Sequence, residues 1–263
     1  MHVDLLSVPG VPDHANEDFA AVSPLGAAVV LDGVTPPPDG DTGCIHTVTW
    51  FVQKLGPALL ERAADRRDQS LADCLAEAIG QTAAAHESTC DLTHRRTPQA
   101  TVVALRWDEH GVEFLVLSDS VLLLDINGAI TPILDTRLDM VTGRPELRSI
   151  RYTRAYFDAL ESLRNAEDGF YTAAADPEVA KRAVTGRLAR AEVRAAAAMS
   201  DGASRWTEVF GFGDWTALFE HIRETGARQL IDEVRVAETA DPDRTAFPRG
   251  KARDDATVVF LEF

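Results

Sequence analysis

Short acidic motifs are spread along the whole chain, and most of them adjoin an apolar run. The four motifs are Asn16-Glu17-Asp18, Leu31-Asp32-Gly33, Ser200-Asp201-Gly202 and Asp254-Asp255-Ala256-Thr257. Ala27 to Leu31 leads into the second motif, Ala195 to Met199 leads into the third, and the fourth opens the run from Thr257 to Phe263. Short apolar runs bounded by turn-forming residues are typical of strands. Because carboxylates at strand ends can converge although they are far apart in sequence, these motifs predict one shared acidic site.

A cluster of carboxylates at neutral pH requires a cation, because neighbouring carboxylates repel and raise each other's pKa. The metal ligands that the acidic motifs supply are carboxylate oxygens. The histidines show no H-x-x-x-H spacing for zinc, and Cys44, Cys74 and Cys90 form no C-x-x-C pair. Oxygen ligation is typical of hard ions, so the sequence predicts Mg²⁺ or Mn²⁺.

The charge of the chain argues against two classes of partner. The 26 basic and 42 acidic residues give a net charge of −16, whereas nucleic acids and anionic membranes are bound by basic surfaces. No apolar run is long enough to span a bilayer, which takes about 18 residues. A phosphorylated substrate stays possible, since two bound divalent ions would reverse the local field.

The compartment follows from the N-terminus and the cysteines. Met1-His2-Val3-Asp4 has no basic stretch that leads into a long apolar segment, so we expect no secretory signal. An odd number of cysteines predicts reduced thiols in a cytoplasmic protein. Cys44 and Cys74 fall on predicted helical stretches, where buried packing is their expected role.

The spacing of apolar residues predicts strands in groups and helices in pairs. Strands are expected at 3–8, 19–22, 27–31, 100–107, 112–117, 121–126, 130–134, 195–199 and 257–263, and the four in the middle read as one antiparallel meander. Helices are expected from the caps Asp41 and Thr42 to Leu59, after Ser70, at 154–164, at 177–190 and at 215–234. Pro36-Pro37-Pro38-Asp39-Gly40 predicts a rigid connection. This arrangement favours α+β layers in a single domain, 1–263.

In the order and spread of its four motifs, the chain resembles the metal-dependent protein phosphatases, the type 2C Ser/Thr family. The resemblance extends from about Val3 to Phe263. It implies two antiparallel β-sheets packed as a sandwich and flanked by pairs of helices, with two metal ions at one end. These are the four layers αββα.

The resemblance also implies roles for individual residues. Asp32 would bridge the two ions and the Gly33 carbonyl would reach one of them, with Asp201 and Asp254 as further metal ligands. Glu17 would bind metal directly or through water, and Asp18 would join Asp32 in catalysis. Asp119 matches an acid of a third, looser metal site. Arg205 stands where the family has that site's other acid, which argues against a third ion and leaves Asp119 a hairpin residue as the alternative.

The residues expected around a substrate phosphate depart from the family. Its Arg before the N-terminal Glu is Asp13 here, with His14 beside it, and Asp32-Gly33 continues Val34-Thr35-Pro36. A basic stretch from Arg137 to Arg154 lies where the family carries a variable flap. We therefore take His14, Arg144 and Arg148 as candidate substrate-binding residues, and a solvated loop is the alternative for the arginines. Asp255 replaces a usual Asn and is expected to orient Asp254.

Taken together, the residues and the resemblance predict a metal-dependent phosphomonoesterase. A phosphoserine or phosphothreonine protein is the favoured substrate. Two alternatives remain open: an enzyme that acts on a small phosphorylated metabolite, and a phosphatase-like binding module that has lost efficient turnover.

Overall fold

The strands form two antiparallel five-stranded sheets in this computed structural model, which describes residues 1–37 and 40–263. Pro38 and Asp39 of the expected rigid connection lie outside the described residues. The first sheet has the order β1 (His2–Val8), β10 (Ala256–Glu262), β9 (Val193–Met199), β6 (Val121–Ile126) and β7 (Ala129–Ile133). The second has the order β2 (Phe19–Ser23), β3 (Ala27–Leu31), β4 (Val102–Trp107), β5 (Gly111–Leu117) and β8 (Val184–Ala189).

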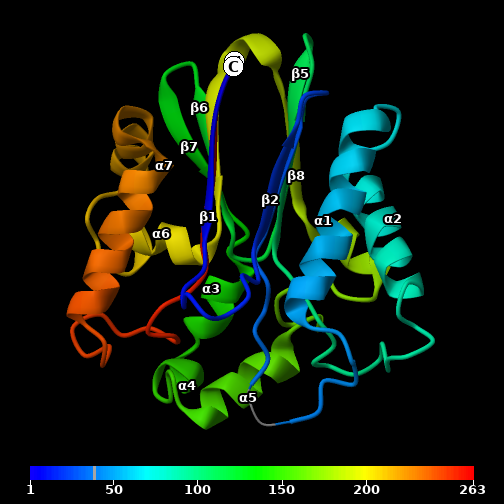
Figure 1. The fold of residues 1–263 in the computed structure, drawn as a ribbon, viewed down its shortest axis with the longest axis vertical. Coiled ribbons are helices and arrows are strands. Elements are labelled where there is room, and N and C mark those ends of the chain that lie inside the picture. The colour runs from blue at the N-terminus through cyan, green and yellow to red at the C-terminus, as the bar shows by residue number, and fades with distance from the viewer. Residues whose placement is uncertain (38–39) are drawn as a thin grey trace.

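Pairs of helices cover the outer faces of the two sheets (Figure 1). Helices α1 (Val48–Asp65) and α2 (Leu71–Ala84) pack on the second sheet, and α6 (Asp201–Glu208) and α7 (Trp215–Ala240) pack on the first. At the lower end of the sandwich in Figure 1 lie α3 (Arg137–Thr142), α4 (Pro145–Arg148) and α5 (Arg154–Leu163). Two short 3₁₀ helices, η1 (Pro177–Arg182) and η2 (Arg190–Glu192), flank β8. The expected αββα sandwich is thus confirmed.

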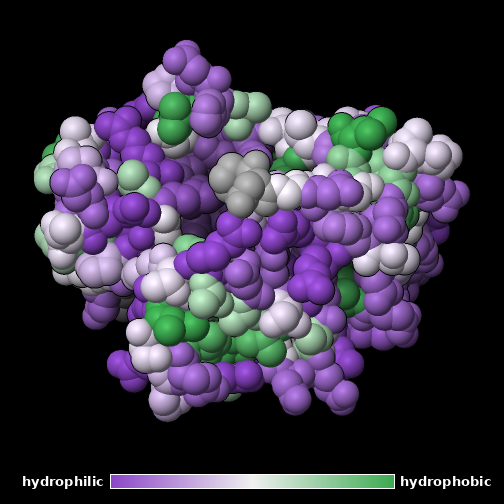
Figure 2. All heavy atoms as spheres, turned by 90° about the horizontal axis from the view of Figure 1, so that it is seen from below, coloured by the Kyte–Doolittle hydropathy of each residue, from purple (hydrophilic) through white to green (hydrophobic). Residues whose placement is uncertain are grey.

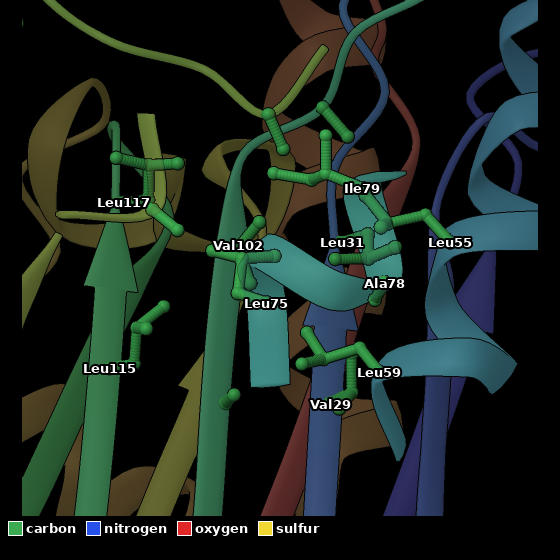
Figure 3. Packing of buried hydrophobic residues seen from close by; sticks show 14 of the residues in the cluster. Val29, Leu31, Leu55, Leu59, Leu75, Ala78, Ile79, Val102, Leu115 and Leu117 are labelled. Atoms are coloured by element: carbon green, nitrogen blue, oxygen red, sulfur yellow. The ribbon is translucent and has the colours of Figure 1, made fainter. Parts of the chain in front are cut away.

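Alternation along the strands divides the core into layers. Val29 and Leu31 of β3 pack against the helices, whereas Ala28 and Val30 face the other sheet. On the helical side, Leu55 and Leu59 of α1 meet β3 at a spacing of four residues, as Figure 3 shows. These leucines are fully buried, and each burial stabilises the fold by about 1.5–3 kcal/mol. The core therefore holds the end of β3, and with it Asp32, in a fixed place.

The predicted four-stranded meander is wrong, because β5 and β6 belong to different sheets. The chain crosses between the sheets at Ser118–Ser120, where Ser118 has a φ of 70°. Both flanking strands are apolar, so their pattern fits a strand in either sheet equally well. The crossing places Asp119 at one end of the sandwich rather than in an ordinary hairpin.

Two helix predictions also need correction. Residues 177–190 form η1 followed by β8, since Val184–Ala189 pairs with β5 and its residues alternate between half-buried and exposed. Helix α1 begins at Val48 rather than after Asp41 and Thr42, because Thr47 caps it by accepting from the Trp50 amide at 3.1 Å. Cys44 therefore lies in a loop, not on a helix. In the described residues, no helix is both long and apolar enough for a membrane span.

Candidate metal centre

The four acidic motifs come together at one end of the sandwich. Asp32 follows β3, Asp201 is the first residue of α6 after β9, and Asp254 precedes β10. The Asp201 amide donates to the Asp32 carboxylate at 3.3 Å, and the Thr257 hydroxyl donates to Asp18 Oδ2 at 2.7 Å. Three strand ends and the segment between β1 and β2 thus supply one acidic site.

Asp255 holds the N-terminal motif against the C-terminal one. Its two carboxylate oxygens accept from the Gly10 amide at 2.7 Å and from the Glu17 amide at 2.6 Å. The Glu17 side chain in turn accepts from the hydroxyl of Thr35. The Asp255 side chain therefore positions Glu17 and the adjoining Asp18, while the Asp255 amide donates to Asp254 Oδ1 at 3.2 Å and so also orients Asp254.

Burial and mutual repulsion raise the pKa values of the clustered acids. The pKa of Asp32 lies well above its usual range, first because the group is desolvated and second because the Asp201 carboxylate is close. Burial raises the pKa of Asp18 to about 7. Burial and then Asp254 raise the pKa of Asp201 to about 6. Without a cation, these carboxylates hold protons that they would not hold in water.

The residues present fit a divalent oxygen-binding ion. Among the described residues Asp18 Oδ1 is buried and has no hydrogen-bond partner, and the Asp18 carboxylate is close enough to raise the pKa of Asp32. Gly33 is buried beside it, and a Cβ there would lie 2.4 Å from Val48 Cγ1 and 2.5 Å from the Glu17 carbonyl oxygen. Only glycine fits this position. Asp18, Asp32, the Gly33 carbonyl and Asp201 therefore form a donor set suited to Mg²⁺ or Mn²⁺.

Asp254 is held by two cations of the chain itself. Lys251 Nζ lies 2.7 Å from Asp254 Oδ1, and Arg205 Nη2 lies 2.9 Å from Asp254 Oδ2. Arg205 also pairs with Glu238 at 2.6 Å. We had noted Arg205 only as a missing acid, and Lys251 had been overlooked, although its spacing of three residues from Asp254 was visible in the sequence.

Asp119 belongs to the same electrostatic neighbourhood. It accepts a hydrogen bond from the Ser118 hydroxyl at 3.1 Å. Burial raises its pKa, and its charge contributes to the raised pKa of Asp32.

Glu208 on α6 is an acid near the site that the sequence analysis did not predict. Burial, with contributions from Asp201 and Asp119, raises its pKa to about 7. Its spacing of seven residues from Asp201 places both acids on one face of α6 and was a usable signal.

Two cavities adjoin the acids and share Lys251. One, of about 430 Å³, is lined by residues that include Asp13, His14, Glu17 and Asp254. The other, of about 420 Å³, is lined by residues of the 34–37 segment, by Gln99 and by three arginines, Arg96, Arg154 and Arg164. Figure 2 shows this end of the molecule, where mostly hydrophilic side chains surround a central hollow. Lys251 and Thr35 therefore line both cavities, and Glu17 and Asp254 line the first one directly.

The three candidate substrate-binding residues, His14, Arg144 and Arg148, lie in different surroundings. His14 is exposed and lines the first cavity. Arg144 donates to the Asp168 carbonyl at 2.5 Å, and Arg148 is exposed on α4. The cations that line the two cavities are Lys251, Arg253 and the three arginines of the second cavity.

Comparison with known proteins found solved structures that are similar to this chain. No protein-family model and no curated protein matches the sequence. The Mycobacterium tuberculosis serine/threonine phosphatase PstP/Ppp is 18% identical, with 100% of this chain and 98% of that chain covered and a TM-score of 0.63.

Two further solved structures are similar over nearly the whole chain. The catalytic domain of PstP in complex with two manganese ions is 17% identical, with 99% and 97% covered and a TM-score of 0.61. A serine/threonine phosphatase of Staphylococcus aureus is 12% identical, with 99% and 94% covered and a TM-score of 0.62. This chain therefore has the fold of the bacterial serine/threonine phosphatases, as its motifs had led us to expect.

Proposed function

We propose that this protein is a metal-dependent phosphomonoesterase that acts on phosphoserine or phosphothreonine in proteins. The observation that carries the proposal is the convergence of Asp18, Asp32 and Asp201, with raised pKa values, around an unpartnered buried oxygen. The shared fold with a phosphatase catalytic domain that holds two manganese ions supports it.

Asp32, the Gly33 carbonyl, Asp201 and Asp254 would hold two Mg²⁺ or Mn²⁺ ions, with Glu17 reaching them directly or through water. Such ions, when bound, lower the pKa of water and neutralise phosphoryl oxygens. Of the chain's own groups, Asp18 Oδ1 is free to accept a proton, because the Thr257 hydroxyl occupies only Oδ2. We assign Asp18 that proton-accepting role and assign Asp32 the positioning of both ions.

Lys251 is our candidate for the cation that holds the substrate phosphate. It lines both cavities and also donates to the Thr35 hydroxyl at 2.8 Å, so its ammonium is fixed beside the acids. His14 borders the same space and would contact the substrate there. Arg144 and Arg148 stay in the proposal as contacts of a larger protein substrate, because α4 lies next to α5, which carries Arg154.

A second function rests on one specific observation. Asp254 is already neutralised by Lys251 and Arg205, so part of the acidic cluster is balanced without any ion. A phosphatase-like module that binds a phosphorylated partner but does not turn it over would use this arrangement. A small phosphorylated metabolite is a third possible ligand for the 420 Å³ cavity.

The deciding experiment is hydrolysis of a chromogenic phosphate monoester with Mn²⁺, Mg²⁺ or excess chelator, beside a panel of phosphopeptides and small phosphorylated metabolites. We expect turnover only with the metal, and faster turnover of phosphopeptides than of metabolites. Asp32→Asn should be inactive, whereas the exposed control Asp243→Asn should behave like wild type. Binding of phosphopeptides without any turnover would favour the binding module.

The proposal also covers the domain organisation and the compartment of the protein. We treat residues 1–263 as one domain, since the phosphatase structures are covered at 94–98% of their length. We place the protein in the cytoplasm because none of its three cysteines forms a disulfide, as expected in a reducing compartment.

A further inference from the structure

Two cysteines and two histidines, none of them part of an acidic motif, converge in the structure. They are Cys44, His46, His86 and Cys90, which we call the Cys–His cluster. Their ligand atoms all lie within 4.8 Å of one another, and among residues 1–37 and 40–263 no other His, Cys, Asp or Glu group of three or more is this compact. The cluster takes no part in the proposed phosphatase chemistry.

The distances within the cluster are those of a metal-binding shell. Cys44 Sγ lies 3.7 Å from His46 Nδ1 and 3.4 Å from His86 Nδ1, and Cys90 Sγ lies 3.4 Å from His46 Nδ1. Tetrahedral zinc, with bonds of about 2.3 Å to sulfur and 2.0–2.1 Å to nitrogen, separates such ligand pairs by about 3.5 Å. The two sulfurs are the exception, because their 2.8 Å separation is longer than the roughly 2.05 Å of a disulfide bond and shorter than the roughly 3.75 Å between two zinc-bound sulfurs. Zinc binding would therefore move the two sulfurs apart by about 1 Å.

The four ligands come from the chain segments that enter and leave the helical hairpin formed by α1 and α2. Cys44 and His46 precede the first turn of α1, and His86 and Cys90 follow the last turn of α2. Gly43 lets these segments approach, with a φ of 68° and a carbonyl that accepts from the Asp91 amide at 2.7 Å. A Cβ on Gly43 would lie 2.5 Å from His94 Cβ, so a larger residue would push the segments apart.

The surroundings orient the ligands, and hydrogen bonds favour thiolate at Cys90, whereas burial raises the pKa of the Cys44 thiol to about 11. The His46 amide points at Cys44 Sγ at 3.4 Å, and the Ile45 amide is directed at Cys90. Trp50 on α1 stacks on the His46 ring at 4.0 Å between centroids and lies 5.0 Å from the His86 ring.

His86 has little other reason to be buried. It is only 2% exposed, its Nε2 has no hydrogen-bond partner, and its Nδ1 is directed at a cysteine sulfur. Burying a polar ring with so few partners is costly unless a further group satisfies it. A metal ion bound at Nδ1 would replace the weak contact with the cysteine sulfur and would leave Nε2 as the protonated ring nitrogen.

We propose that Cys44, His46, His86 and Cys90 bind one Zn²⁺ as a structural site that joins the start of α1 to the end of α2. Two thiolates and two imidazoles form a closed, neutral tetrahedral shell with no open position, as in structural rather than catalytic zinc sites. Binding releases the two thiol protons to solvent, so the charge balances. This inference does not depend on the phosphatase proposal.

The zinc would also stabilise the wall of the second cavity. The segment that leads to Cys44 contributes Val34 and Thr35 to that wall, and the segment that leaves Cys90 contributes Thr97 and Gln99. Near the acids these segments are joined by one hydrogen bond from the Val34 amide to the Gln99 carbonyl, at 2.9 Å. At their other ends the segments are joined by the hydrogen bond from the Asp91 amide to the Gly43 carbonyl, and zinc bound by the Cys–His cluster would reinforce that second junction.

The test is elemental analysis of tag-free protein produced with zinc in the medium and purified under reducing conditions. We expect about one zinc per chain, retained through gel filtration with EDTA and lost below about 0.2 per chain in Cys44→Ser and Cys90→Ser. The matched control Cys74→Ala removes the third, buried thiol and should keep its zinc. Asp32→Asn should also keep it, which separates this site from the acidic one.

Wild-type protein alone gives a second readout in case the serine variants fail to fold. Replacing zinc by Co²⁺ should produce thiolate-to-cobalt charge transfer and the intense visible absorption of tetrahedral coordination. Thiol titration in denaturant with chelator should find three thiols without prior reduction. Zinc-free protein overturns the proposal, either with three thiols or with a single thiol, the latter indicating a Cys44–Cys90 disulfide. Zinc retained in Cys90→Ser overturns it as well.

Discussion

The acidic site and the Cys–His cluster both gather four or more potential ligands from distant parts of the chain, but they do so in opposite ways. The acidic site takes carboxylates from the ends of strands in both sheets, and one of them, Asp254, is paired with Lys251 and Arg205. The Cys–His cluster takes sulfur and nitrogen from two loops and is compact, with its ligand atoms all within 4.8 Å.

The difference follows from charge. Carboxylates are ionised at neutral pH and repel, so without an ion the acidic site is relieved by protonation and by cations of the chain. Thiols and imidazoles can be neutral, so the Cys–His cluster can close without a metal. We therefore expect the acidic site to exchange weakly held hard ions, and the Cys–His cluster to hold one zinc tightly.

The largest effect should come from the acidic site. Asp32→Asn removes the carboxylate that would position both ions, and we expect turnover of a phosphate monoester to fall at least about 10³-fold, since the lost stabilisation is worth several kcal/mol. Steady-state kinetics at saturating Mn²⁺ measure this. Circular dichroism should show that the variant is folded. Turnover within tenfold of wild type would mean that the site is misassigned.

The next effect concerns stability and belongs to the Cys–His cluster. Removing zinc with a strong chelator under denaturant-free conditions, or by Cys90→Ser, should lower Tm by about 5–10 °C, because a loss of a few kcal/mol shifts Tm by about 2–4 °C per kcal/mol in a chain of this size. Differential scanning fluorimetry with and without added zinc measures it. Cys74→Ala should retain the full zinc-dependent increase. A wild-type Tm that does not change when zinc is added or removed would contradict the assignment.

Lys251→Ala tests which cation holds phosphate. If Lys251 binds the substrate phosphate, KM should rise about tenfold while kcat changes less, as expected for lost ground-state binding. The exposed control Lys181→Ala should leave KM unchanged. The double variant Arg144→Ala/Arg148→Ala should raise KM less on a chromogenic monoester than on a phosphoprotein. If KM for the chromogenic monoester rises more in the double arginine variant than in Lys251→Ala, phosphate binding belongs to Arg144 and Arg148 instead.

The smallest effect is a dependence of stability on pH in the metal-free protein. The pKa values of Asp201 and Asp18 rise from 3.8 to about 6 and about 7, so the folded chain binds more protons than the unfolded chain in that window. Their contribution to stability therefore falls as pH rises from about 4 to about 7. In chelator at pH 7.5, Asp32→Asn should raise Tm by about 2–4 °C over wild type and by less at pH 4.5. An equal difference at both pH values would exclude carboxylate repulsion as the cause.

The two sites also differ in how well they could be predicted from the sequence. Asp32, Asp201 and Asp254 are conspicuous because each sits at the end of an apolar run, and the strand pattern made their convergence expected. The cations that balance them were not conspicuous. Lys251 and Arg205 carry no motif, and their role depends on how α6 and the 250–254 turn pack together.

The Cys–His cluster was missed for a physical reason. Its ligands occur as Cys44-x-His46 and His86-x-x-x-Cys90, about forty residues apart, and neither half is a familiar zinc pair. We had also placed Cys44 on a helix, whereas Thr47 caps α1 three residues later. Only the antiparallel packing of α1 on α2 brings the two halves together. The meander failed for the same kind of reason, since apolar strands such as β5 and β6 carry no mark of the sheet they join.

The central claim is that one chain holds two chemically separate metal sites, and a crossed metal analysis tests it most directly. Zinc content and Mn²⁺ binding by titration calorimetry would be measured side by side on wild type, Asp32→Asn and Cys90→Ser. The account predicts that Asp32→Asn keeps zinc and loses Mn²⁺ binding, while folded Cys90→Ser loses zinc and keeps Mn²⁺ binding. Loss of both metals in either folded variant, or wild type that binds neither, would contradict it.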